Sequence, residues 1–275
     1  MNTKLLTVFT RTPLHVGAGS SVGAVDQPVV RERHTHFPVI PGTAIKGVLS
    51  DLWNDASFKR TEEGKRYFGE DDNKAEKQFS GSLAFGEAKL LAFPVRSAKG
   101  CFAFVTSPLC LERYKRDAGL SFAIPTLERN TCLAGADVVF EDKEAVILEE
   151  YCFAKKGAFP EDWAKQLAAL ADDAVLNGGT ARFVLIPDED MSFFAENACQ
   201  ISQHVCIDSE TGTAAEGKLF NQEEVPSETL FYAPITELRT DCDYVNFAKK
   251  ISERPLVQFG GKGTSGIGYC SVKLV

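Results

Sequence analysis

The sequence predicts a mixed α+β fold, with a ferredoxin-like core that carries insertions. Three observations lead to this expectation. Short runs rich in β-branched and aromatic residues alternate with segments whose apolar residues recur at helical spacing. Turn-forming clusters separate several runs in the manner of hairpins. Strand–helix–strand units mixed with hairpins are typical of the α+β class, and a split βαβ core fits the order best.

The individual elements follow from local patterns. A strand is expected from Lys4 to Arg11, and an amphipathic helix from Ala44 to Trp53, just after Pro41. Residues 60–80 are polar and are expected to be irregular. The turn cluster at residues 209–213 predicts a hairpin between two short strands, Gln203–Asp208 and Gly217–Phe220. The other expected helices are Ser107–Ala118, Glu161–Leu170 and Tyr244–Ile251, and the other expected strands are Leu83–Val95, Gly100–Thr106, Ala145–Phe153, Arg182–Ile186, Glu228–Ile235, Leu256–Phe259 and Gly268–Leu274.

Composition and charge narrow the functional classes. The net charge of −8 argues against a nonspecific nucleic-acid binder, but the charge is unevenly distributed. Residues 1–60 and 239–275 each carry a net charge of +3, whereas residues 61–238 carry −14. If the two ends meet in the fold, they form a positive face on an acidic body. No apolar run approaches the ~20 residues of a membrane span, and the N-terminus does not resemble a signal peptide, so a cytoplasmic location is expected.

The stretch GGKGTSGIGYC, from Gly260 to Cys270, contains the G-x-G-x-x-G spacing of a dinucleotide-binding turn. Such a turn needs a following helix and strand, and only nine residues follow Gly266, so this interpretation is excluded. Two interpretations remain. In the first, exposed glycine N–H groups beside Lys262, Thr264 and Ser265 bind phosphate. In the second, the stretch is a glycine-rich hairpin or bulge with a structural role alone.

Another glycine loop, HVGAGSSVGAVDQP, runs from His15 to Pro28 and contains the carboxylate of Asp26. In chain order it is the first glycine loop, and the stretch that begins at Gly260 is the second. Function often resides on such loops, although an aspartate before Gln-Pro is more often a turn residue. The basic cluster RERHTH, residues 31–36, is better suited to a structural or RNA-facing role than to a metal site, because two histidines do not complete one. The segment PGTAIKG, residues 41–47, places a helix N-terminus beside a threonine and a lysine, which suits phosphate.

In this order, the four elements resemble the repeat-associated mysterious protein (RAMP) superfamily of CRISPR systems. The closer resemblance is to the backbone subunits of type III-B (Cmr) effector complexes. It is carried by TRTPLHVGAGSSVGAVDQPVVRERHTHFPVIPGTAIKG from Thr10, HVCIDSETGTAAEGKLFNQEEVPSETLFY from His204, and GGKGTSGIGY from Gly260.

The resemblance implies a single domain over residues 1–275. Its palm would be a modified ferredoxin-like (RRM-like) unit built from the N- and C-terminal parts, with insertions within 60–200 and a protruding β-hairpin thumb at about 201–225. Several copies would align along a CRISPR guide RNA as a helical filament, together with other Cmr subunits.

The resemblance also implies an activity: cleavage of complementary target RNA at regular intervals, as antiviral defence. Asp26 matches the catalytic loop aspartate and would bind Mg²⁺ or another divalent cation, or act as a general base. His15 matches a histidine of the same loop, and Glu223 and Glu224 lie where the family has acidic residues near the cut site. The positions expected to contact guide RNA are Gly17, Gly19, Ser20, Arg31, Arg33, Thr43, Lys46, Gly261, Lys262, Gly263, Thr264, Ser265 and Gly266.

Three alternatives stay open from the sequence. The chain could be a guide-RNA-binding scaffold without cleavage activity, or the equivalent backbone subunit of a type III-A complex. The third and least favoured alternative is an oxidoreductase with a bound flavin or nicotinamide.

Overall fold

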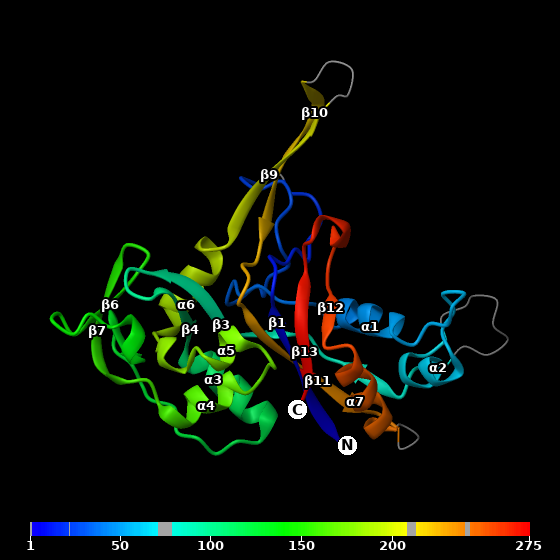
Figure 1. The fold of residues 1–275 in the computed structure, drawn as a ribbon, viewed down its shortest axis with the longest axis horizontal. Helices are drawn as coiled ribbons and strands as arrows, with labels where there is room; N and C mark the ends of the chain where they lie inside the picture. The colour runs from blue at the N-terminus through cyan, green and yellow to red at the C-terminus, as the bar shows by residue number, and fades with distance from the viewer. Residues whose placement is uncertain (1, 22, 71–78, 208–212, 240–242) are drawn as a thin grey trace.

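A computed structural model describes residues 2–21, 23–70, 79–207, 213–239 and 243–275. It confirms the mixed α+β class, with a core rich in β-sheet. At the centre, strand β1 (Thr3–Thr10) lies between β13 (Tyr269–Leu274) and β11 (Leu230–Glu237), and both pairings are antiparallel (Figure 1). The two basic ends of the chain therefore meet, which is the condition under which they form a positive face on an acidic body.

The sheet continues on both sides of these central strands. Strand β12 (Leu256–Gln258) pairs with β13, while β2 (Leu83–Phe85) and β3 (Lys89–Ser97) pair with β11. Beyond β3, the sheet runs through β4 (Cys101–Thr106), β8 (Phe183–Leu185), β5 (Thr131–Ala134), β7 (Tyr151–Ala158) and β6 (Ala145–Leu148). One pairing, between Ser97 and Leu148, brings β6 back to β3.

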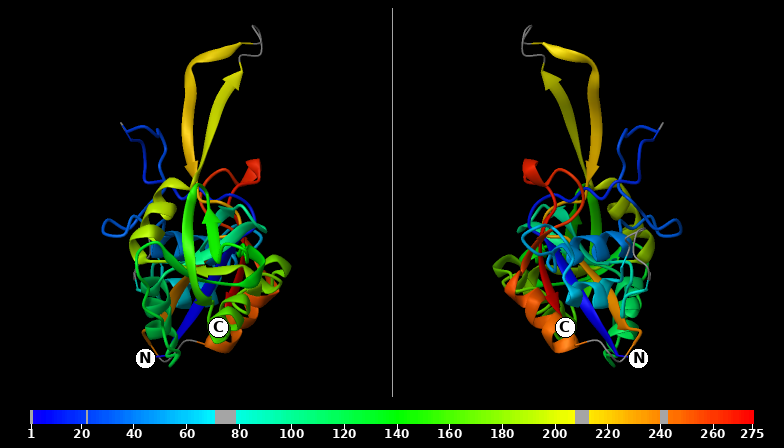
Figure 2. Two further views of the ribbon diagram at one scale, coloured as in Figure 1. Left: turned by 90° about the vertical axis from the view of Figure 1, so that its left-hand side faces the viewer. Right: turned by 90° about the vertical axis from the view of Figure 1, so that its right-hand side faces the viewer.

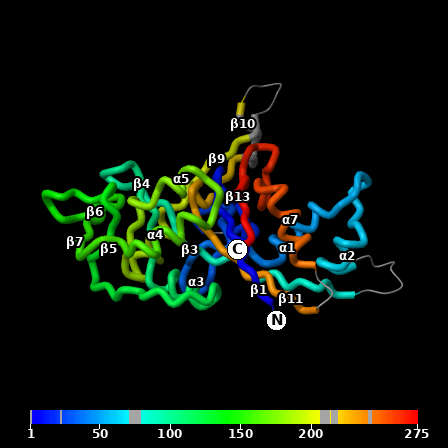
Figure 3. The backbone as a smooth tube through the Cα atoms, turned by 60° about the horizontal axis from the view of Figure 1, so that its bottom comes forward, coloured from blue at the N-terminus to red at the C-terminus, as the bar shows by residue number. Residues whose placement is uncertain are grey.

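The helices form two groups on either side of the central strands (Figures 1 and 3). One group comprises α1 (Gly42–Asp51), α2 (Glu62–Phe68) and α7 (Tyr244–Glu253). The other comprises α3 (Pro108–Ala118), α4 (Glu161–Ala168), α5 (Ala174–Asn177) and α6 (Asp188–Asn197). Within the described ranges, none of these helices has the length and apolar character needed to cross a membrane.

The hairpin expected between Gln203 and Phe220 is present, and both strands are longer than expected. Strands β9 (Gln200–Ile207) and β10 (Ala214–Glu224) form a separate two-stranded antiparallel sheet. The turn expected at residues 209–213 lies largely outside the described residues. The hairpin projects from the body at the end opposite the two chain termini (Figures 1 and 2).

Helix α2 corrects the expectation that residues 60–80 are irregular. The Thr61 side chain caps this helix by accepting the N–H of Gly64. Tyr67 and Phe68 are buried, and their rings pack against Trp53 at centroid distances of 5.5 and 5.3 Å. The polar composition of the segment concealed the helix, because two aromatic side chains suffice to fix one short amphipathic turn on the core.

The expectation of one strand from Ala145 to Phe153 was also wrong. This segment forms β6 and β7, which pair as a tight hairpin. Glu149 occupies the turn with φ of 51°. Glutamate is rare in that left-handed conformation, and no glycine, asparagine or proline marks a turn at this position.

A partly buried polar cluster connects α3 to the central sheet. The Asp117 carboxylate accepts hydrogen bonds from Lys89 Nζ (2.7 Å), Tyr232 Oη (3.0 Å) and Arg116 Nε (3.0 Å). Burial alone would raise the pKa of Asp117, but the hydrogen bonds from Arg116 and Lys89 outweigh it and lower the pKa below 3.8. Because the pKa is lower in the folded state, this contribution is complete above about pH 4 and is lost as the pH falls through the folded value.

We therefore expect Asp117→Asn to lower the free energy of unfolding by about 1–3 kcal/mol near neutral pH, because it leaves the Lys89 ammonium without its partner. The difference from the parent protein should shrink below about pH 4. Urea unfolding at several pH values measures both effects. Asp172→Asn, which removes an exposed partner of Lys273, is the control and should cost less than about 1 kcal/mol. A difference that does not change with pH would contradict this explanation.

Candidate functional site

The outer edge of β10 binds the first glycine loop. One edge of β10 pairs with β9, and the other faces residues 14–27. Gln27 donates its N–H to the Asn221 carbonyl (3.1 Å) and accepts the N–H of Glu223 (3.0 Å). Leu14 and Val225 exchange two hydrogen bonds of 2.8 Å. The loop is thus attached at both of its ends to one strand edge at the base of the hairpin.

The two predicted cleavage residues are attached to the same edge. Asp26 accepts the backbone N–H of Asn221 through Oδ2 (2.8 Å). The Nδ1 atom of His15 lies 2.7 Å from the carbonyl oxygen of Glu223. Because residues two apart on a strand are separated by about 7 Å, β10 fixes the spacing of the two anchoring points.

The partner of His15 determines where its proton resides. A carbonyl oxygen only accepts, so Nδ1 donates, and a neutral ring carries its lone pair on Nε2. His15 is 9% exposed, whereas Asp26 is exposed. A Cβ on Gly17 would lie 2.8 Å from this Nε2. Gly17, expected to contact RNA, therefore has a structural reason to be glycine: a side chain would crowd the imidazole.

The second glycine loop packs against the backbone of His15. Gly260 has φ of 76°, and a Cβ there would lie 2.1 Å from the His15 carbonyl oxygen. The N–H of Gly268 donates to the carbonyl of Pro13 (2.8 Å). Figure 2 shows the first loop, in blue, and the second loop, in red, on either side of the hairpin base.

Side chains inside the second loop hold its carbonyl groups. Gln258 Nε2 donates to the carbonyls of Phe259 (3.0 Å) and Ile267 (3.1 Å), and Tyr269 Oη donates to that of Gly263 (3.2 Å). Gln258 could not be recognised from the sequence, because a glutamine at the end of a strand has no pattern that indicates a role in a loop. The exposed side of the loop comprises Gly261, Thr264, Ser265 and Gly266.

Lys262 makes a contact that the sequence did not suggest. Its ammonium lies 4.7 Å from the ring centroid of Phe220, on β10. The Nζ atom is buried and has no hydrogen-bond partner in the part of the chain that the structure describes. The Phe220 ring in turn stacks on His204 of β9, with centroids 5.2 Å apart. Lys262 therefore connects the second glycine loop to the hairpin.

The expectation for Glu223 and Glu224 needs correction, because both side chains are buried. Glu223 accepts the N–H of Val29 (2.9 Å) and pairs with Arg31 (2.5 Å). Glu224 accepts from Ser202 Oγ and Gln222 Nε2, each at 3.0 Å. Carboxylates turned inward and already hydrogen-bonded are not placed to contact RNA, so these two residues support the site rather than form its surface.

The expectation that Arg31 holds the guide backbone is corrected for the same reason. Its guanidinium donates to the carbonyls of His36 (2.6 Å) and Ala195 (2.8 Å) as well as to Glu223. Arg33, by contrast, is exposed in the turn that follows. The histidines of this cluster lie beside carboxylates, His34 near Glu32 and His36 near Glu196.

The remaining predicted contacts do not gather at the hairpin base. Thr43 and Lys46 lie on α1, and Lys46 lines a depression formed with α2 and β2. Gly19 and Ser20 are exposed on the first loop, near Asp26 in sequence. No group of three or more metal-ligating side chains occurs within the described ranges, so a metal at Asp26 would take most of its ligands from elsewhere.

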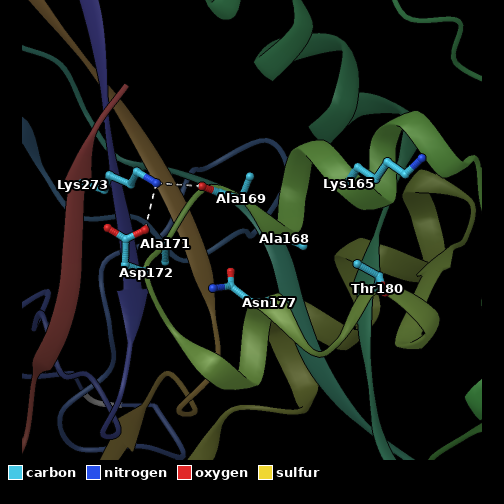
Figure 4. A pocket seen from close by; sticks show the side chains of 8 residues that line it. All are labelled: Lys165, Ala168, Ala169, Ala171, Asp172, Asn177, Thr180 and Lys273. Carbon is cyan, nitrogen blue, oxygen red and sulfur yellow. Dashed lines mark hydrogen bonds and ion pairs between the residues drawn. The ribbon is translucent and has the colours of Figure 1, made fainter.

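A separate cavity lies between α4, α5 and β13 (Figure 4). Lys273 crosses it to Asp172 (2.9 Å) and to the carbonyl of Ala169 (3.2 Å). The other lysine, Lys165, pairs with Glu161. Because both cations already have acidic partners, the cavity offers no free positive charge.

The family model for the RAMP superfamily matches residues 7–271. The chain belongs to the RAMP superfamily. A curated RAMP relative, the CRISPR system Cmr endoribonuclease Cmr4 of Pyrococcus furiosus, is 37% identical over all of this chain and 96% of its own length. The crystal structure of oligomeric Cmr4 from that organism superimposes with a TM-score of 0.75 at 30% identity, covering 100% of this chain and 98% of the other.

Two further similarities are weaker. The Csm3 endoribonuclease of Mycobacterium tuberculosis, from a Cms CRISPR system, is 29% identical over 51% of this RAMP chain and 73% of its own length. A type III-B Cmr-beta complex bound to cognate target RNA contains a chain with a TM-score of 0.76 at 20% identity, covering 100% of this chain and 97% of its own, which is a likeness of fold alone.

The contact between the RAMP chain's two glycine loops gives a matched pair of variants. We expect Gly260→Ala to destabilise the protein by about 2 kcal/mol, because alanine is strained at positive φ and its Cβ would strike the His15 carbonyl. Gly261→Ala meets nothing within 4 Å and should change the unfolding midpoint little. Chemical unfolding compares the two, and equal effects would show that the close approach at Gly260 is unimportant.

Proposed function

We propose that this chain is the guide-RNA-binding backbone subunit of a type III-B CRISPR effector complex, and that it cleaves complementary target RNA at regular intervals as antiviral defence. The observation that carries the proposal is the pair Asp26 and His15, held by the outer edge of β10 at the hairpin base. The similarity over the whole chain to a protein named as the Cmr endoribonuclease supports the same activity. Acting on RNA within such a complex, the chain would work in the cytoplasm.

We propose further that the central strands form a ferredoxin-like (RRM-like) palm within one RAMP domain over residues 1–275. The spatial order β13–β1–β11–β3, with α1 after β1 and α7 after β11, supports this arrangement. The hairpin of β9 and β10 is then the thumb, and the insertions lie within residues 60–200. The palm brings the two glycine loops together because β1 and β13 are neighbours.

In the proposed reaction, a hydroxyl attacks the scissile phosphate in line, and the bond from phosphorus to the leaving ribose oxygen breaks. The attacking hydroxyl loses a proton, and the leaving oxygen takes one up. His15 is suited to accept that proton at Nε2, because Nδ1 is committed to the carbonyl of Glu223. Asp26 is exposed and keeps Oδ1 without a hydrogen bond to any residue that the structure describes. An unpaired, kinked nucleotide can reach in-line geometry that a duplex forbids, so positioning supplies much of the rate.

Asp26 fits a weakly held divalent cation. Magnesium is commonly bound by one or two carboxylates together with substrate phosphates, and a single exposed carboxylate beside the RNA matches that pattern. When bound, the ion would neutralise charge developing on the phosphate. The chain's own part is to hold this carboxylate against the N–H of Asn221.

Guide RNA would lie along the exposed glycine loops. The surface from Gly261 to Gly266 and the exposed Gly19, Ser20 and Arg33 offer backbone N–H groups, hydroxyls and positive charge for the phosphate backbone, which need not read sequence. Copies of the chain bound side by side along one guide would repeat the site at a constant step. The crystal structure of oligomeric Cmr4 supports an assembly of the chain with itself, which other Cmr subunits would join.

We expect complexes carrying Asp26→Asn to bind guide RNA as the parent does and to lose at least about 100-fold in cleavage rate, because a neutral amide binds the cation much more weakly than a carboxylate and is not a base. A ladder of products from a labelled complementary RNA measures this loss. Unchanged cleavage at regular spacing would instead favour a scaffold without catalytic activity.

The metal requirement has its own test. Removal of divalent cations with EDTA should stop cleavage, and added Mg²⁺ should restore it. Guide-RNA affinity should change by no more than about twofold, because the scissile phosphate of the target completes the coordination shell of the ion. A target carrying a single 2′-deoxynucleotide at the cut site distinguishes the nucleophile. If that target is cut normally, water attacks rather than the ribose hydroxyl.

A type III-A backbone subunit is the remaining alternative, because Csm3 relatives also match. The Csm3 of Mycobacterium tuberculosis matches 51% of the chain, whereas the Cmr4 similarity covers all of it. Assembly of the purified chain with type III-B rather than type III-A partner subunits would separate the two.

A further inference from the structure

Arg31 lies where three parts of the chain meet. Its Nη1 donates to the carbonyls of His36 (2.6 Å) and Ala195 (2.8 Å), and its Nη2 donates to Glu223 Oε1 (2.5 Å) and Cys199 Sγ (3.2 Å). Only 15% of the side chain is exposed. These contacts join the turn after Arg31, the last turn of α6 and the outer face of β10.

Glu223 connects Arg31 to the segment that carries the two proposed cleavage residues. Its second carboxylate oxygen accepts the N–H of Val29 (2.9 Å), three residues after Asp26. Its backbone N–H donates to the Gln27 carbonyl, and its own carbonyl accepts His15 Nδ1. Glu223 therefore contacts residues 15–29 at three points, and its side chain is only 10% exposed.

The buried position of Glu223 depends on Arg31. Among the described residues, Arg31 provides the cation paired with this carboxylate. Burial raises the pKa of the neighbouring Cys199 thiol to about 12, so that group is neutral and supplies no charge. Removing one partner of a buried ion pair is strongly disfavoured, because the other is left without compensation. Movement of the Glu223 side chain toward water would disturb Val29 and the loop that carries Asp26.

We propose that Arg31 is a positioning residue for RNA cleavage: it holds the Glu223 carboxylate in place, so that β10 presents His15 and Asp26 to the scissile phosphate. It does not contact RNA. This inference rests on the proposed cleavage activity. It differs from a phosphate contact, because a guanidinium with four protein acceptors is already committed.

The test uses complexes assembled with guide RNA and parent, Arg31→Met, Glu223→Gln or Arg31→Met/Glu223→Gln subunits. Arg96→Met is the matched control, because it removes an exposed arginine paired with Glu149 on β6–β7. Single-turnover cleavage of a complementary RNA gives the rate constant. Guide-RNA affinity is measured at several salt concentrations, because each phosphate contact adds about one unit to the slope of log K against log salt.

We expect Arg31→Met to cleave about 10- to 100-fold more slowly, with guide affinity within about twofold and an unchanged salt slope. The double variant should recover at least about tenfold, because no unpaired buried charge remains. Arg96→Met should match the parent.

Three outcomes would overturn the inference. A salt slope reduced by about one in Arg31→Met would make Arg31 a phosphate contact. A double variant as slow as Arg31→Met would show that Arg31 does not act through Glu223. An Arg31→Met complex that cleaves at the parent rate would remove any positioning role.

If Arg31→Met does not assemble, the double variant decides. Assembly with cleavage within about tenfold of the parent supports the inference, and assembly without cleavage overturns it. Failure of the proposed function looks different, since the parent complex would then not cleave, or would cleave as fast as Asp26→Asn.

Discussion

The hydrogen-bonded outer edge of β10 is the interaction on which the candidate site depends. A strand edge normally exposes unpaired N–H and carbonyl groups. Here the groups of Asn221, Glu223 and Val225 are taken by the first glycine loop, so a loop rich in small residues acquires strand-like order. The positions of His15 and Asp26 are consequences of that pairing. Without it, both side chains would sit on an unsupported loop.

The central sheet supplies the second constraint. β1 lies between β13 and β11, so the segments that leave β1 and enter β13 must lie close together. Each of those segments is a glycine loop, and their backbones touch at Gly260 and His15. A chain with a net charge of −8 thereby brings its two basic ends to one region, which reconciles an acidic protein with a polyanionic partner.

Local patterns predicted most elements of the central sheet, because periodicity and turn residues are local properties. They also placed Asp26 and His15 in one loop, since loop residues near in sequence are near in space. The roles of Arg31 and Glu223 could not be predicted in the same way. These residues are 192 positions apart, and their pairing is decided by how the hairpin returns to the body. Helix α2 escaped detection because its order comes from Trp53, outside the segment.

The hairpin is supported very differently along its length. At its base, β10 has a partner on each edge, whereas farther out the described residues of β9 and β10 pair with each other alone. Val205 and Leu219, paired across that outer part, are about half exposed. Two strands alone resist bending weakly. The base of the hairpin is held on both edges and keeps His15 and Asp26 in register. The outer part is held on one edge and can bend to fit a neighbouring molecule.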